Sequence, residues 1–366
     1  MTTTSVDLEY LERAKAGKFD LDWLKNCKSE WGIRAKPSKV GLTLRDIAIG
    51  SYGVVPDHAP RRTMAPRGCD IDGEVPDIGY TINNKNEVWA DNLLDLYEEA
   101  VSRQWSATRD IAWSELPELD PDLEHAMCQF ATLLSEIEML ASDFPAKWLW
   151  RINHDFVEAK MFLCTQIMDE ARHSEVFRKR ALAGGGGLGK AIPIVEKFLQ
   201  LVLDARNYDE GSALMHLLAE GLVLSVFRAG ELLAPSPVEK KIFRLCMQDE
   251  ARHVAYGTMH LRYRLEREPA MAVDFHDYLD RGEEIIAVMF TTPEVVEPAA
   301  ILAAGSLKAA EDIGLAASDI LRTRVIEEYL SRCDRAGLPR RGKMKLPESI
   351  LAGTSGGQEG LLRVSA

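Results

Sequence analysis

The chain has 366 residues, of which 46% are hydrophobic and 28% charged, and its formal net charge is −13 at pH 7. This composition excludes a fibrous, collagen-like or fully disordered protein. The length allows one large domain or two of ordinary size. Because acidic side chains are in excess, neither nucleic acid nor an anionic membrane surface is an expected partner.

Targeting signals and cysteine usage point to the cytoplasm. No apolar run approaches the roughly 18 residues of a membrane-spanning helix, so we expect no membrane insertion. The first residues lack the basic and apolar regions of a secretory signal. The six cysteines form no Cys-x-x-Cys pair, and we expect reduced thiols rather than disulfides or a zinc site.

Three regions follow one another along the chain. Residues 30–85 are dense in proline and glycine, which predicts that residues 1–85 form an irregular N-terminal arm or lid. From residue 86 to residue 336 apolar residues recur every three or four positions, as in amphipathic helices. Residues 337–366 are again rich in Gly, Pro and Ser, and we expect a C-terminal tail.

The helical region divides into segments at proline and glycine positions. We expect a first helix from about residue 86 and breaks at Pro145, at the glycines of 184–187, at Pro235 and Pro237, and at Pro293. The further predicted helices span 122–142, 150–181, 191–206, 211–231, 237–266, 272–290 and 308–336. Almost nothing alternates with a period of two, so the sequence predicts an all-α bundle.

An internal repeat carries the chemistry. Residues 169–173 and 249–253 both read Asp-Glu-Ala-Arg-His. In each copy a Glu and a His stand three residues apart, which places both on one helix face. The residues before each copy are apolar, so these carboxylates are expected inside the bundle. A buried carboxylate is costly unless it is paired or bound to a metal.

A further glutamate lies within the apolar helix that precedes each repeat. Glu220 is surrounded by leucines and valine. In the earlier helix only one of Glu136 and Glu138 can point inward, because they stand two residues apart. Glu136 is preferred because its helical neighbours are apolar, namely Leu133, Met139 and Leu140, whereas those of Glu138 are Ser135, Ala141 and Ser142.

The predicted site is dinuclear. Its metal ligands, which are also the expected catalytic residues, are Glu136, Glu170, His173, Glu220, Glu250 and His253. Four carboxylates balance two divalent ions, and without metal they would repel one another. Oxygen and imidazole donors favour iron or manganese, and the pair stays open between Fe/Fe, Fe/Mn and Mn/Mn.

Other polar residues near the predicted ligands allow two interpretations each. Asp169 and Asp249 are expected either to accept a hydrogen bond from a ligand histidine across the bundle or to pair with Arg172 and Arg252 at the surface. His216, one turn before Glu220, is either an additional ligand or an ordinary histidine of the core or pocket.

Between about residues 122 and 265 the segments LLSEIEML, DEARHSEVF, LLAEGLVL and DEARHVAYG resemble the ferritin-like di-iron oxygenase superfamily. That superfamily includes ribonucleotide reductase small subunits, bacterial di-iron monooxygenases and N-oxygenases. The resemblance implies a ferritin-like four-helix bundle with additional helices. It also implies two iron ions that activate O₂ to hydroxylate, N-oxygenate or desaturate a small organic substrate. We expect a homodimer, and electrons from a separate ferredoxin or flavin reductase.

Two positions depart from the superfamily pattern and bear on which function is expected. Phe177 stands where radical-generating reductase subunits carry a Tyr, and Leu224 where bacterial monooxygenases carry a Thr. The alternatives are a ribonucleotide reductase-like radical subunit, an iron oxidation and storage protein, and a metal-free helical interaction protein. The terminal extensions exceed what a minimal storage subunit requires.

The apolar residues closest to the predicted ligands are either plain bundle core or the lining of a dry substrate cavity. They are Phe130, Leu133, Met139, Phe177, Leu217, Leu224 and Phe227.

Overall fold

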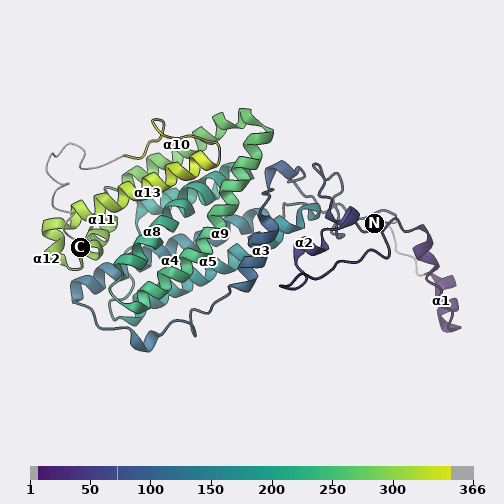
Figure 1. Cartoon of the computed structure of the whole chain (residues 1–366), viewed down its shortest axis with the longest axis horizontal. Helices are drawn as coiled ribbons and strands as arrows, with labels where there is room; N and C mark the ends of the chain where they lie inside the picture. The colour runs from purple at the N-terminus through teal and green to yellow at the C-terminus, as the bar shows by residue number, and fades with distance from the viewer. Residues whose placement is uncertain (1–6, 72, 348–366) are drawn as a thin grey trace.

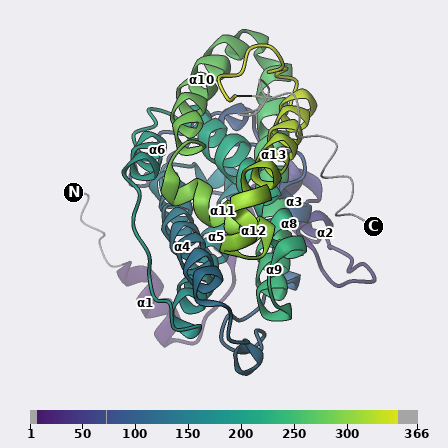
Figure 2. The same ribbon diagram turned by 90° about the vertical axis from the view of Figure 1, so that its left-hand side faces the viewer.

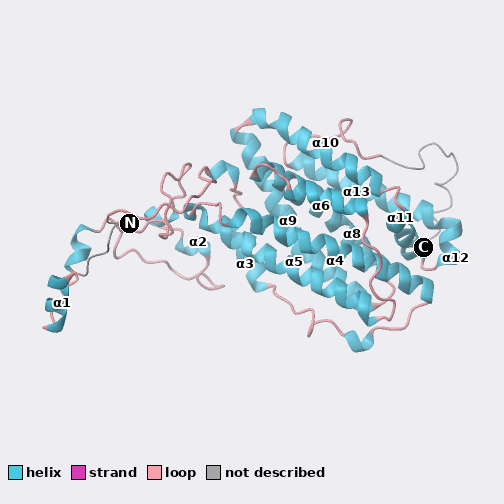
Figure 3. Ribbon diagram, turned by 180° about the vertical axis from the view of Figure 1, so that it is seen from behind, coloured by secondary structure: helices cyan, strands magenta, loops and turns pink. Residues whose placement is uncertain are grey.

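A computed structural model describes residues 7–71 and 73–347 and confirms an all-α protein. Over these residues regular secondary structure is helical, and β-type contacts are limited to isolated bridges (Figure 3). The predicted helical region holds the long helices, while the segment before it contains short helical turns joined by loops.

Four long helices form the central bundle. Helix α4 packs along α5, α8 packs along α9, and α5 also contacts α9 (Figure 1). Their bounds are Pro121–Leu149 for α4, Val157–Ala183 for α5, Glu220–Leu233 for α8 and Pro237–Arg267 for α9. Helix α7 (Tyr208–Ser212) and the π-helical segment Ala213–Ala219 lead directly into α8.

Local sequence explains where the bundle helices begin. The Asp120 side chain accepts a hydrogen bond from the backbone N–H of Asp122, and Pro121 occupies the first turn of α4. Ser236 caps α9 in the same way, ahead of Pro237. Such caps satisfy N–H groups that have no partner within the helix, and proline in the first turn costs no hydrogen bond.

Further helices cover the bundle. Helix α3 lies against α5 and α9, α6 lies between α4 and α10, and α13 lies against α8. In Figure 2, which looks along the bundle, α11 and α12 cross the end that faces the viewer. The bounds are Leu93–Ser102 for α3, Pro193–Leu203 for α6, Ala272–Met289 for α10, Pro293–Ala304 for α11, Leu307–Ala309 for α12 and Leu315–Arg335 for α13.

Two prolines behave differently from the sequence-based expectation. The predicted break at Pro145 is wrong, because Pro145 lies inside α4 and the helix continues past it. The buried side chains of Phe144 and Trp148 on either side anchor this turn in the core, and that packing outweighs the lost backbone hydrogen bond. Pro293 begins a helix that the periodicity missed, since proline fits the first helical turn.

The terminal segments differ in how they meet the bundle. Helices α1 (Leu8–Lys15) and α2 (Leu44–Ile47) lie beyond α3, with α1 far from the bundle (Figure 1). After α13 the chain is fixed by Arg340, which is fully buried and donates hydrogen bonds to Glu283. Residues 1–6 and 72 of the predicted arm and 348–366 of the predicted tail lie outside the described residues.

The continuous helix Tyr208–Leu233 is long and apolar enough to span a membrane, and 72% of its most apolar window is buried inside the protein. It is therefore the core helix of the bundle. A bent pair, α10 with α11, passes the same composition test only if the two helices are counted together.

Candidate metal centre

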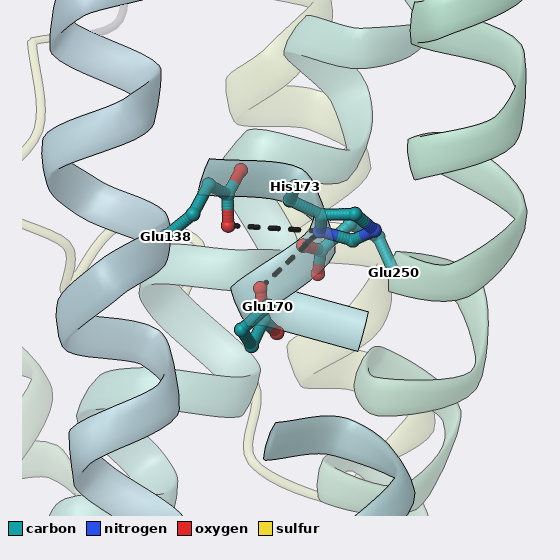
Figure 4. Close-up of side chains that lie close together, drawn as sticks. All are labelled: Glu138, Glu170, His173 and Glu250. Atoms are coloured by element: carbon teal, nitrogen blue, oxygen red, sulfur yellow. Dashed lines mark ion pairs between the residues drawn. The ribbon is translucent and has the colours of Figure 1, made fainter. Parts of the chain in front are cut away.

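Carboxylates and imidazoles from all four bundle helices meet in the interior. Glu170 and Glu250 are each fully buried and belong to two overlapping groups whose ligand atoms lie within 4.8 Å of one another. One group adds Glu138 and His173, and the other adds Glu220 and His253. Figure 4 shows the first group, with the Glu138 and Glu170 carboxylates directed at His173. We call these six residues the carboxylate cluster.

Both histidines present Nδ1 to the carboxylates. The Nδ1 atom of His173 lies 3.3 Å from Glu170, 3.4 Å from Glu250 and 3.8 Å from Glu138. The Nδ1 atom of His253 lies 2.9 Å from Glu170 and 3.5 Å from Glu250. Glu170 and Glu250 therefore stand between the two imidazoles, and both candidate groups share them.

The inward-facing atoms of the cluster lack hydrogen-bond partners. These buried atoms are both carboxylate oxygens of Glu170 and of Glu250, one oxygen each of Glu138 and Glu220, and both Nδ1 atoms; none of them forms a hydrogen bond. Buried polar groups in proteins almost always form hydrogen bonds, and a buried polar group without one costs free energy. The donor set and its charge fit two divalent metal ions, which would satisfy these atoms together.

Burial also shifts the pKa values of Glu138 and Glu220, the outer carboxyls of the cluster. Burial raises the pKa of Glu138 well above its usual range, and the nearby charge of Glu170 raises it further. Burial likewise raises the pKa of Glu220, with the charge of Glu250 adding to it. The raised pKa values favour the protonated form of these carboxyls, whereas a bound cation would favour the ionised form.

Two aspartates fix the histidines from behind, across the bundle. Nε2 of His173 lies 3.2 Å from Oδ2 of Asp249, and Nε2 of His253 lies 3.4 Å from Oδ2 of Asp169. Each aspartate therefore accepts a hydrogen bond from the Nε2–H group of the histidine in the other repeat. This arrangement leaves Nδ1 as the free ligand atom.

The alternative interpretation of these aspartates, pairing with arginines, also applies, but inside the protein. Arg172 lies 2.8 Å from Asp249, and Arg252 lies 2.9 Å from Asp169. Both arginines are buried. Trp105, which the sequence reasoning missed, donates its indole N–H to Asp249 at 2.7 Å.

The structure corrects the preference for Glu136. Its carboxyl faces Glu196 of α6, and this burial and carboxyl contact raise its pKa to about 7. Two residues along an α-helix turn a side chain by about 200°, so Glu138 points to the cluster instead. The small residues around Glu138 were the missed signal: they leave room for carboxylates inside the bundle.

His216 lies outside both candidate ligand groups. It is fully buried, with Nδ1 2.8 Å from the Ser212 hydroxyl and Nε2 3.2 Å from Oε1 of Gln166. Gln166 in turn donates a hydrogen bond of 2.7 Å to Glu220. Sequence reasoning missed Gln166; its position on α5, one turn before Glu170, was the signal that could have placed it beside the cluster.

Aromatic rings separate the cluster from an apolar cavity. The ring of Phe227 lies 6.3 Å from that of His173 and packs on Phe177 and Phe243. Beyond Phe243 and Phe130 lies a cavity of about 200 Å³ between α4, α8, α11 and α13. Of the seven residues predicted as core or cavity lining, Phe130 lines this cavity. Met139 is half exposed, and the other five are buried in the bundle core.

No family model and no curated protein matched the chain in sequence comparisons. Solved structures did match. Two mutants of an R2-like ligand-binding oxidase, each with an anaerobically reconstituted Mn/Fe cofactor, align with TM-scores of 0.53 and 0.52. They are 17% and 18% identical to this chain, and the alignments cover 68% of it and 94% of each oxidase. The chain therefore has the ferritin-like helical fold that its repeated motif implied.

Proposed function

We propose that this protein is an O₂-activating di-metal oxidoreductase that oxygenates or desaturates a small organic substrate. The observation that carries the proposal is the carboxylate cluster with its unpaired inward-facing atoms. The Mn/Fe cofactor of the structurally similar oxidases supports a redox-active metal pair. We propose iron in both positions or one iron and one manganese, in the cytoplasm.

The chain's own residues would divide the work as follows. Glu170 and Glu250 would hold both ions, while Glu138 with His173 and Glu220 with His253 would complete one half-site each. A bound metal pair would supply the redox chemistry with O₂. Asp249 and Asp169 would keep each Nε2 proton in place, so that Nδ1 stays available.

The apolar surroundings favour an organic substrate over storage of iron. Phe177 and Phe227 exclude water on the side of His173, which protects an oxidising centre from side reactions. The apolar cavity beyond Phe243 is large enough for a small molecule. Storage would instead require a polar route for iron. Phe177 also leaves that position without the phenol a radical subunit would use.

Two partners complete the proposal. Electrons would come from a separate ferredoxin or flavin reductase. A second copy of this chain would cover the N-terminal arm, whose apolar side chains Phe19, Trp23 and Trp31 are 73%, 71% and 66% exposed.

The first experiment counts metal and then adds O₂. We expect the apo-protein to bind two Fe²⁺ per chain under anaerobic conditions, and to develop a transient visible absorption when O₂ is admitted. Glu170→Ala and Glu250→Ala each remove a ligand shared by both half-sites, so we expect both variants to lose both ions. Glu136→Gln is the matched control because it lies on the same bundle outside the cluster, and it should keep two ions.

Contrary results are equally clear. Fewer than one iron per chain in the parent protein, or binding unaffected by both alanine substitutions, would mean that the repeat is structural. Oxidised iron that accumulates as a mineral in large cages would support storage instead.

The cavity is tested separately. Ala299→Phe on α11 fills part of the cavity without changing a residue of the cluster. We expect it to keep two metal ions and to lower substrate-stimulated O₂ consumption at least tenfold. Unchanged stimulation would exclude this cavity as the substrate site.

A further inference from the structure

Glu220 and Glu138 differ in the hydrogen bonds that their carboxylates accept. Oε1 of Glu220 accepts a hydrogen bond from Gln166, while its Oε2 is unpaired. Glu138 accepts no hydrogen bond from residues 7–71 or 73–347, and its Oε2 only faces Nδ1 of His173 at 3.8 Å. The two repeats are identical in sequence, but their outer carboxylates are not equivalently supported.

The hydrogen bonds behind Glu220 form a chain with one consistent direction. As a metal ligand Glu220 is an acceptor, so the Gln166 amide nitrogen must face it and Oε1 of Gln166 must face His216. Nε2 of His216 therefore carries the proton and donates at 3.2 Å. Nδ1 then accepts from the Ser212 hydroxyl at 2.8 Å. Burial lowers the pKa of His216 well below its usual value, which keeps the imidazole neutral as this chain requires.

The surrounding structure holds His216 in one position. Its ring meets Phe144 edge-on at 5.3 Å and Tyr256 edge-on at 5.1 Å. Gly257 of α9 faces it, and a Cβ there would lie 2.2 Å from the Cβ of His216. His216 also sits within the π-helical segment that leads into α8, and π-helical turns are frequent at functional sites.

We propose that Ser212, His216 and Gln166 are positioning residues that orient Glu220 as a metal ligand and make its half-site the tighter of the two. Oε1 of Glu220 accepts the hydrogen bond from Gln166 and also lies 3.9 Å from Nδ1 of His253. The hydrogen bond therefore fixes the carboxylate beside His253 and leaves Oε2 unpaired. Glu138 has no such support and must be oriented by the ion itself. This proposal rests on the proposed dinuclear centre.

The test uses Mn²⁺ alone, measured by equilibrium dialysis and by electron paramagnetic resonance. We expect two Mn²⁺ per parent chain with a magnetically coupled spectrum. Gln166→Leu and His216→Leu each break the chain, and such outer hydrogen-bond partners typically contribute 10- to 100-fold in metal affinity. We expect at least tenfold weaker binding at one half-site and the six-line signal of an isolated Mn²⁺ at the other.

Two further variants separate positioning from folding. His216→Gln keeps a donor near the place of Nε2, so we expect two coupled ions again. Ser212→Ala removes only the outermost hydroxyl and favours the helix, so we expect a severalfold loss at the same half-site even if the leucine variants fail to fold. The thermal midpoints of the apo-proteins report whether each variant folds.

The outcomes discriminate. Parent-like binding of both ions by Gln166→Leu and Ser212→Ala would overturn the proposal, as would loss of both ions together with a collapse of apo-protein stability. A parent chain that binds fewer than two ions would refute the proposed function itself. Two coupled ions that remain inert toward O₂ would refute the function and leave the positioning proposal standing.

Discussion

Each histidine of the carboxylate cluster is oriented by an aspartate of the other repeat. The Nε2 atoms of His173 and His253 lie 3.2 Å and 3.4 Å from Asp249 and Asp169. The aspartates are themselves neutralised by the buried arginines of the two repeats. Each copy of the repeat therefore supplies the same set of groups. Its Glu and His are candidate ligands, its Asp accepts a hydrogen bond from the opposite histidine, and its Arg balances the charge of an aspartate.

Asp249→Asn tests this arrangement. The amide is a weaker acceptor than the carboxylate and leaves buried arginine charge less compensated. We expect roughly 10- to 100-fold weaker metal binding, measured by equilibrium dialysis, together with a lower thermal midpoint. Asp274→Asn removes an equal charge from an exposed position of α10 and should change neither. Equal affinities for both variants would contradict the orienting role of Asp249.

Glu136→Gln tests the carboxyl contact between α4 and α6. The pKa of Glu136 is raised to about 7 from an ordinary value of 4.5, so the folded protein binds this proton more tightly than the unfolded chain. Its contribution to stability is complete below pH 4.5 and is lost as the pH rises through 7. We expect the glutamine variant to unfold at a higher temperature than the parent at pH 8, and to show no such gain at pH 4.5. An equal difference at both values would exclude titration as the cause.

At the scale of elements, the pairing of the 208–233 helix with α9 depends on close approach. The π-helical segment brings His216 against α9, where Gly257 offers no Cβ. Elsewhere on this helix Gly221 faces only the guanidinium end of Arg332, at 3.2 Å. The two glycines therefore differ in what a methyl group would displace.

Gly257→Ala should be destabilising despite the better helix propensity of alanine. Its Cβ would lie 2.2 Å from the Cβ of His216. Because a Cβ moves only with its backbone, the two helices would be forced apart at a cost of about 3 kcal/mol. Gly221→Ala meets a flexible side chain and should change stability by less than about 1 kcal/mol. Urea unfolding of both variants measures the difference. Similar free energies would show that the helices separate easily here.

At the scale of the whole molecule, the arm leaves large apolar side chains uncovered by the rest of the chain. It extends beyond α3 (Figure 1), and Trp23 and Trp31 are mostly exposed. Residues 23–45 contain six Lys and Arg against one Glu, while the complete chain has a net charge of −13. A basic, aromatic segment on an acidic protein is complementary to a second copy.

If a second copy covers the arm as proposed, the double substitution Trp23→Ser with Trp31→Ser should give a monomer, because it removes the largest apolar side chains from the proposed contact. Light scattering after size-exclusion chromatography measures the mass. Metal content should stay at two ions per chain, since the arm residues lie outside the cluster. A monomeric parent protein would exclude a second copy as the partner that covers the arm.

The sequence alone determined the helical architecture and most of the cluster, because periodicity and the repeat are properties of neighbouring residues. Glu170, His173, Glu220, Glu250 and His253 came from spacing and apolar context alone. Tertiary structure decided what depends on packing between distant segments. It turned Glu138 inward through the contact of α4 with α6, and carried α4 through Pro145. It also joined Ser212, His216 and Gln166, which no local pattern connects, because only the folded bundle brings α5 against the helix before Glu220.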